Sequence, residues 1–136
     1  MIIADTSGLL ALFNRTEPEH ATVRDLVARQ GEPMIVSPYV VAEIDYLVAT
    51  RVGVRAELEI LAELGGGAYV LPEIGAEDLT RIVEVLGKSR DQQIGVADAS
   101  IVLLAARYGS KSLLTLDHRH FGVLRPLQGG RFKLLP

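Results

Sequence analysis

Met1-Ile2-Ile3-Ala4-Asp5-Thr6-Ser7-Gly8 is the stretch of sequence that decides the fold, because a short apolar run stops there on a carboxylate. An apolar run of this length, bounded by polar residues and Gly, is typical of a fully buried strand and places Asp5 at its carboxyl end. Open α/β sheets bind their ligands beyond the carboxyl ends of their strands. Taken alone, Asp5 is also explained as an ordinary N-cap for a helix over residues 9–13. Its function therefore depends on the other acids.

The composition predicts a single domain, residues 1–136, held together by aliphatic packing. Hydrophobic residues make up 49% of the chain and aromatic residues only 5%. This apolar content fills a core and leaves an apolar face that a partner could cover. The chain has no cysteine, which excludes disulfides, thiol catalysis and Cys-ligated zinc. The composition fits a reducing compartment, and we expect a cytoplasmic protein without a signal peptide or a membrane span.

The charge distribution is uneven along the chain. The net charge of −3 argues against a protein that coats nucleic acid by bulk electrostatics. After Asp117, however, no acid remains, and the basic residues there are Arg119, Arg125, Arg131 and Lys133, beside His118 and His120. This segment is either solvated surface or a strip that contacts phosphates. Arg119 and Arg125 are the tentative RNA-binding candidates.

Apolar periodicity alternates between the helical and the strand pattern throughout, which predicts an α/β fold. We expect helices at about 9–13, 17–30, 38–51, 54–64, 76–86 and 91–109, and strands at 1–4, 34–36, 68–71, 112–116 and 132–135. Gly31 marks the end of the second helix, and Ser37-Pro38 has the N-cap chemistry that begins the third. No repeat or linker divides the chain.

An acid lies on the apolar face of the third helix. Val40, Glu43 and Leu47 are spaced by three and four residues, so they share one side, and we expect Glu43 among apolar side chains. A buried carboxylate must be neutral, paired with a cation or bound to a metal.

Two more acids have unusual settings near the end of the chain. Asp98 is embedded in the apolar helix predicted over 91–109. Asp91 lies two turns earlier on a similar face, where it is explained as an ordinary acid in the first turn of that helix. Asp117 ends the strand at 112–116, and Thr115 shares its side of that strand.

These acids define one hypothesis for the site. In a sheet covered by helices, Asp5, Glu43, Asp98 and Asp117 can converge on one crevice. Their mutual repulsion is relieved by protonation or by a hard cation with oxygen ligands, Mg²⁺ or Mn²⁺. A divalent ion held by carboxylates can bind a phosphodiester and lower the pKa of a water. The chemistry indicated is phosphoryl hydrolysis.

The chain resembles PIN-domain ribonucleases and, among them, VapC toxins of type II toxin-antitoxin pairs. The resemblance covers nearly the whole chain and rests on Ile2-Ile3-Ala4-Asp5-Thr6-Ser7, Ser37-Pro38-Tyr39-Val40-Val41-Ala42-Glu43, Ile94-Gly95-Val96-Ala97-Asp98-Ala99-Ser100 and Leu114-Thr115-Leu116-Asp117-His118-Arg119-His120-Phe121. It implies a three-layer α/β/α sandwich with a central, mostly parallel sheet. It also implies a Mg²⁺-dependent endonuclease that cleaves structured RNA, often transfer or ribosomal RNA.

The same resemblance implies a role for each matching residue. Asp5 and Asp98 correspond to the principal metal ligands, and Glu43 and Asp117 to acids that complete the site through a second metal or an ordered water. Thr6 and Thr115 correspond to hydroxyls that hydrogen-bond these carboxylates or the scissile phosphate. Some relatives carry a further acid where this chain has His120. The implied partners are a VapB-type antitoxin that covers the site and a second copy in a homodimer.

Other protein families that begin with a strand followed by an Asp match this sequence less well. A haloacid-dehalogenase-like phosphatase has a second Asp two residues after the first, where this chain has Ser7. A receiver domain requires paired acids near the first strand and a Lys after a late strand, and neither is present. The remaining alternatives are a non-catalytic PIN-like module that binds RNA or acts as a scaffold, and a different metal-dependent phosphohydrolase.

Overall fold

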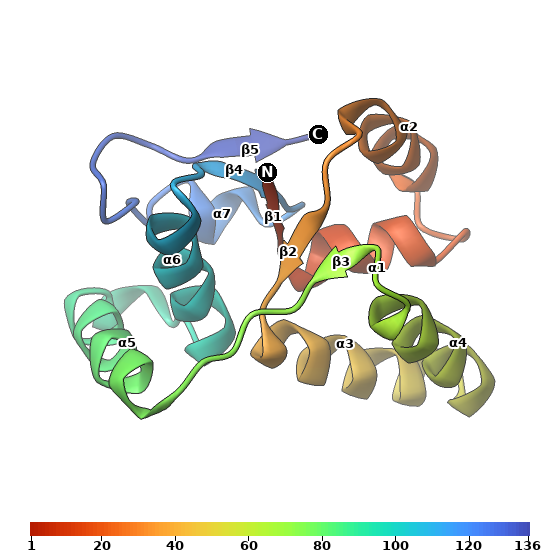
Figure 1. Cartoon of the computed structure of the whole chain (residues 1–136), viewed down its shortest axis with the longest axis horizontal. Coiled ribbons are helices and arrows are strands. Elements are labelled where there is room, and N and C mark those ends of the chain that lie inside the picture. The colour runs from red at the N-terminus through yellow and green to blue at the C-terminus, as the bar shows by residue number, and fades with distance from the viewer.

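Five short strands form one parallel sheet at the centre of the protein in the computed structural model, which describes all residues 1–136. The strands are β1 (Ile2–Ala4), β2 (Met34–Val36), β3 (Tyr69–Val70), β4 (Ser112–Leu114) and β5 (Lys133–Leu135). Their order is β3-β2-β1-β4-β5, and every neighbouring pair is parallel (Figure 1). The chain moves one way from β1 to β3 and the other way from β4 to β5. The switch point, where open α/β sheets bind ligands, therefore lies between β1 and β4.

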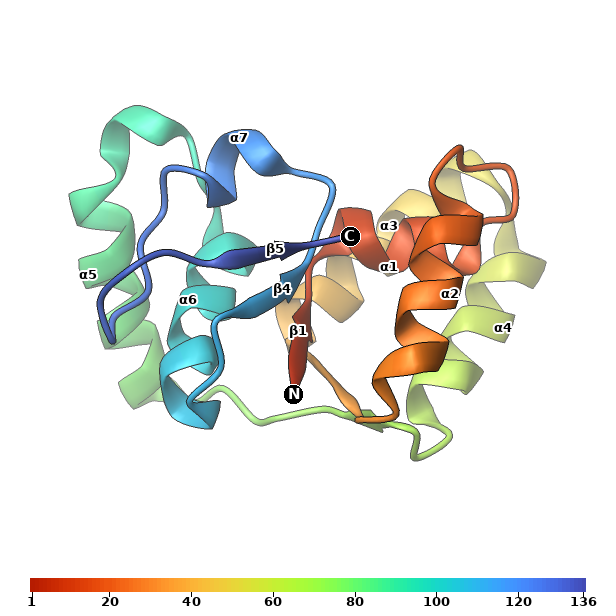
Figure 2. The same cartoon turned by 90° about the horizontal axis from the view of Figure 1, so that it is seen from above.

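Seven α-helices cover the sheet. They are α1 (Thr6–Phe13), α2 (His20–Gln30), α3 (Pro38–Arg51), α4 (Val54–Gly65), α5 (Ala76–Lys88), α6 (Val96–Tyr108) and α7 (His118–Phe121), with a short 3₁₀ turn, η1 (Arg90–Gln92), before α6. Figures 1 and 2 both place α1 to α4 on one side of the sheet and α5 and α6 on the other. Because parallel crossovers are right-handed, reversing the direction of travel puts the later helices on the opposite face. The three-layer α/β/α sandwich is confirmed, and its sheet is entirely parallel.

The core lies where these layers meet. The central strands are buried along their whole length, and α6 buries every residue from Ala99 to Ala105, as its small and apolar sequence predicts. Gly8 lets α1 approach β4 closely, because a Cβ there would lie 2.4 Å from the backbone oxygen of Leu114. This close approach brings the beginning of α1 against the end of β4.

Several predicted boundaries are wrong. The helix expected over 91–109 is two elements, because Gln93 is left-handed and Gly95 is extended, so Asp91 lies in η1 and not on the face of α6 that carries Asp98. Residues 17–19 precede α2 instead of forming its first turn, and the helix predicted over 76–86 ends two residues later, at Lys88.

None of the helices combines the length and apolar character that crossing a membrane requires.

Candidate active site

Asp5 lies at the switch point and is held by two hydroxyl groups. It occupies the N-cap position of α1, yet its side chain caps no backbone amide. Instead, its Oδ2 accepts hydrogen bonds from Ser7 Oγ and Thr115 Oγ1, each at 2.8 Å. No hydrogen bond reaches Oδ1, and the residue is only 6% exposed. The capping explanation for Asp5 is therefore wrong, and one carboxylate oxygen is left for a ligand.

Asp98 lies in the first turn of α6, beside Asp5. Burial of its side chain and the negative charge of Asp5 raise the pKa of Asp98 to about 6, with a smaller increase from Glu43. The His120 side chain and a hydrogen bond from the Gly95 backbone partly oppose this pKa shift. Burial and neighbouring carboxylates thus both disfavour the charged form of Asp98, and His120 offsets only part of this effect.

Asp117 follows β4 and is the N-cap of the short helix α7. Its Oδ1 accepts a hydrogen bond of 3.0 Å from the His120 amide, and its Oδ2 lies 2.9 Å from His120 Nδ1. The same Nδ1 lies 3.8 Å from Asp98 Oδ2. The strand expected to reach residue 116 ends at Leu114, so Asp117 is placed by its cap and not by a strand.

Glu43 differs most from its expected environment. The buried face of α3 consists of Val40, Ile44 and Val48, and Glu43 lies at the edge of that face with an exposed side chain. The prediction of a carboxylate among apolar side chains is wrong, because a three-to-four spacing defines a wide stripe whose edge reaches solvent.

The four acids nevertheless meet in one cavity of about 500 Å³. Its polar lining comes from Asp5, Glu43, Asp98 and Asp117 together with Thr6, Ser7, Arg51, Gly95 and His120. Arg51 makes no ion pair within 4.0 Å with any of these carboxylates. None of these four acids therefore forms an ion pair with a Lys or Arg, although Arg51 lines the same cavity. Side chains from β1, α3, α6 and the β4–α7 connection converge as the sequence predicted.

The hydroxyl groups of the site divide into two kinds. Thr115 is fully buried, and its Oγ1 both donates to Asp5 and accepts a 2.9 Å hydrogen bond from the Asp117 amide. Thr6 is 3% exposed, and its Oγ1 has no hydrogen-bond partner, although it lines the cavity. Buried hydroxyls are nearly always bonded, which makes Thr6 a natural partner for a ligand.

Ser7 is the residue whose role the sequence did not indicate. Its Oγ donates to Asp5 and accepts a 2.9 Å hydrogen bond from the Leu116 amide, so it joins α1 to the end of β4. The available signal was a hydroxyl two residues after an acid at a helix start, a spacing at which Ser bonds locally.

The two candidate RNA-binding arginines lie outside the carboxylate cavity. Arg119 is exposed on α7 and lines a second cavity that shares His120 with the first. The guanidinium of Arg125 donates a 3.0 Å hydrogen bond to the Gly122 carbonyl.

A parallel sheet that gathers acids beyond its carboxyl edge matches the PIN domain, whose family model covers residues 2–124. The chain belongs to the PIN domain family and, within it, to the VapC proteins. It is 53% identical over 135 residues to Ribonuclease VapC26 of Mycobacterium tuberculosis (strain ATCC 25618 / H37Rv). The alignment covers 99% of this chain and 100% of that protein. The crystal structure of VapC20 from Mycobacterium tuberculosis, described as a Sarcin-Ricin loop cleaving toxin, matches all of both chains with a TM-score of 0.86 at 21% identity. This second likeness supports the fold.

Proposed function

We propose that the protein is a Mg²⁺-dependent endoribonuclease toxin that cleaves structured RNA, transfer or ribosomal RNA, and is neutralised by a cognate VapB-type antitoxin. The main support is the meeting of four carboxylates and an unpartnered Thr6 hydroxyl in one cavity, where no carboxylate forms an ion pair with a Lys or Arg. The 53% identity to a protein named Ribonuclease VapC26 favours RNA as the substrate.

The donor set fits Mg²⁺, with Mn²⁺ as an alternative. The carboxylates offer oxygen ligands, which hard cations prefer. Burial and the charge of Asp5 raise the pKa of Asp98, so a bound cation would stabilise its charged form. No three acidic or His side chains form a ready-made metal-binding group. Mg²⁺ does not need one, because it keeps several waters and binds through one or two carboxylates. In this proposal Asp5 and Asp98 hold the ion directly, and Glu43 and Asp117 act through water.

The bound ion would lower the pKa of a water and bind a phosphate oxygen. The residues of the chain position the reacting groups. Thr115 and Ser7 fix Oδ2 of Asp5, which lines the cavity, and leave its Oδ1 without a hydrogen bond. Thr6 Oγ1 is free to donate to a phosphate oxygen. Arg119 and Arg125 supply positive charge for the flanking RNA backbone.

The same cavity suggests how the antitoxin acts. A cationic side chain from a partner would neutralise these carboxylates, none of which pairs with a Lys or Arg of this chain, and would block the metal site. Exposed apolar residues, among them Tyr46, Val54 and Leu58, are compatible with contacts to this antitoxin and to a second copy in a homodimer. The alternative of a non-catalytic RNA-binding module gains no support from a site that retains all four acids.

The test is cleavage of purified total RNA, with the new 5′ ends mapped by sequencing. Cleavage should require Mg²⁺ or Mn²⁺, stop in excess EDTA and return when Mg²⁺ is restored. Asp5→Asn and Asp98→Asn should abolish it while retaining the helical circular dichroism spectrum. Unchanged cutting in EDTA would refute the metal hypothesis, and near wild-type turnover of either variant would refute the ligand assignment.

A further inference from the structure

A second cavity, of about 440 Å³, lies directly beside the carboxylate cavity. His120 lines both, and its Nδ1 is 2.9 Å from Asp117 and 3.8 Å from Asp98. A group bound in the second cavity is therefore separated from the acids by a single imidazole ring. Its volume falls within the range of about 300–1,000 Å³ found for small-ligand sites. The proposed ribonuclease function assigns Arg119 to the RNA backbone but assigns no ligand to this cavity.

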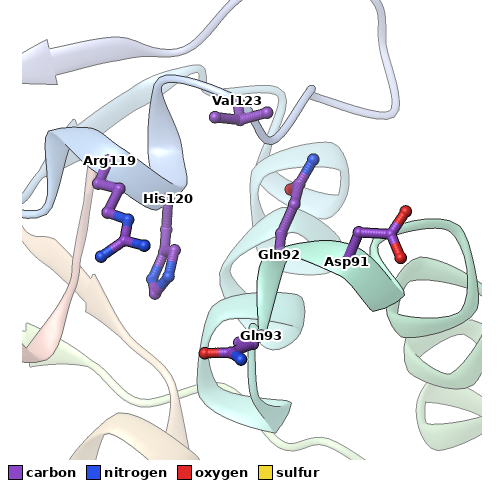
Figure 3. A pocket seen from close by; sticks show the side chains of 6 residues that line it. All are labelled: Asp91, Gln92, Gln93, Arg119, His120 and Val123. Atoms are coloured by element: carbon purple, nitrogen blue, oxygen red, sulfur yellow. The ribbon is translucent and has the colours of Figure 1, made fainter.

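The two walls of the cavity carry side chains that suit different parts of an RNA base. Figure 3 shows Arg119 and His120 projecting from α7 on one side of the cavity, and Gln92 at the end of η1 and Gln93 directly after it on the other. Val123 and Asp91 complete the lining of the cavity. Planar guanidinium and imidazole groups stack on unpaired bases, and side-chain amides bond to base edges. The carboxylate of Asp91 points away from Arg119 and His120 (Figure 3).

The η1 wall is held in an unfavourable conformation. Gln93 has a φ of +53° and is the one residue other than Gly with a positive φ. This conformation costs roughly 1–2 kcal/mol for an L-residue, and such strain concentrates at binding sites. In addition, the buried Oε1 of Gln92 has no hydrogen-bond partner. Gln93 ends η1 in this left-handed conformation, and a ligand with a hydrogen-bond donor would satisfy the free oxygen of Gln92.

We propose that this cavity binds one unstacked purine base of the RNA substrate, next to the scissile phosphate. The inference rests on the proposed ribonuclease function and adds a specificity site to it. Gln pairs with adenine through N6 and N7, and Arg pairs with guanine through O6 and N7. The atom common to both pairings is N7, which pyrimidines lack. A peptide is a poorer fit, because only one of the six lining residues is hydrophobic.

The test uses short stem-loop RNAs that carry each of the four bases at each loop position, and maps cleavage rates by base. At one position adjoining the cut, the wild-type protein should prefer purines by roughly tenfold, the size of one bidentate base contact. Replacing that purine by its 7-deaza analogue should remove the preference, whereas the same replacement one position further away should not.

Gln93→Gly provides the matched protein variant. Glycine accepts a positive φ without strain, so the thermal unfolding midpoint should not fall, while the amide is lost. This variant should cleave purine and pyrimidine substrates within about threefold of each other. Gln30→Ala, which changes an exposed glutamine at the end of α2, should keep the wild-type preference. A wild-type preference in Gln93→Gly, or equal cleavage of 7-deaza and natural purines, would overturn the subsite.

Binding measured in EDTA separates this inference from the proposed function. Wild-type protein should bind the natural purine RNA roughly tenfold more tightly than the 7-deaza RNA, which matches the preference expected in cleavage. This difference in affinity should not depend on whether Mg²⁺ later permits cleavage. Cleavage without base discrimination refutes the subsite and leaves the ribonuclease function intact. Discrimination in binding without any cleavage in Mg²⁺ refutes the ribonuclease function and leaves the subsite intact.

Discussion

The hydroxyl of Thr115 donates a 2.8 Å hydrogen bond to the carboxylate of Asp5, across 110 positions of sequence. The same hydroxyl accepts from the Asp117 amide at 2.9 Å, so one buried side chain orients two of the four acids. Such supporting bonds fix the direction in which a carboxylate offers its remaining oxygen. The positions of Asp5 and Asp117 are thus coupled through the end of β4.

Thr115→Val should test this coupling. The substitution leaves the Asp117 amide and one bond to Asp5 unsatisfied, which should lower the free energy of unfolding by about 1–3 kcal/mol. RNA cleavage should fall by about 10- to 100-fold, as is typical when a group that supports a metal ligand is lost. Urea denaturation and initial cleavage rates measure the two effects. Thr115→Ser retains the hydroxyl and should recover most of both; equal activity of the Val and Ser variants would contradict the role of the bond.

Asp98→Asn should stabilise the protein in EDTA in a pH-dependent way. The pKa of Asp98 is raised from 3.8 to about 6, so the folded protein binds the proton more tightly than the unfolded chain does. Above pH 6 the ionised carboxylate destabilises the fold, and below the unfolded pKa this penalty disappears. Removing the charge should add about 1–2 kcal/mol at about pH 7.5, a value reduced for partial solvent contact.

The matching measurement is urea denaturation of wild type and Asp98→Asn at about pH 7.5 and about pH 4. The difference between the two proteins should shrink markedly at the lower pH, because Asp98 is then protonated in the folded state. A difference that is independent of pH would mean that burial and the neighbouring carboxylates do not raise the pKa of Asp98 in the folded protein.

Gly8→Ala should be strongly destabilising. Its Cβ would lie 2.4 Å from the Leu114 backbone oxygen, so α1 must move away from β4. Overpacking of this kind costs about 1–3 kcal/mol or more, and displacement of α1 should also lower cleavage by moving Asp5. Gly87→Ala in α5 is the matched control, since a Cβ there meets nothing within 4 Å and should be neutral or slightly stabilising. Comparable thermal midpoints for the two variants would show that the close approach is not required.

Arg119→Ala and Arg125→Ala should weaken RNA binding and reduce its dependence on salt. Each phosphate contact to single-stranded RNA contributes about 0.7 to the slope of log affinity against log salt, so each loss should flatten the slope by that amount. Fluorescence anisotropy in EDTA over a salt series measures it. Arg55→Ala on α4, where Arg55 pairs with Glu59, is the control. An unaltered slope would make the corresponding arginine ordinary surface.

The amino-acid sequence by itself determined the class of fold and the four acids. The buried strands are continuous apolar runs in the sequence, and α6 consists mostly of small and apolar residues. The α/β alternation therefore follows from local sequence patterns. Asp5, Asp98 and Asp117 were noticeable because each interrupts or ends such a run. The exposure of Glu43 could not be read in this way, because spacing gives the face of a helix but not how far the face turns toward a neighbour.

Only the tertiary structure decided how these side chains are supported and what lies next to them. The roles of Ser7 and Thr115 depend on α1 meeting the end of β4, a contact between segments more than a hundred residues apart. Likewise, the cavity between η1 and α7 joins residues 91–93 to residues 119–123, which no local pattern links. Local sequence patterns report which groups a segment buries. Which buried groups face each other depends on how the layers pack, since each of those contacts joins residues that no local pattern links.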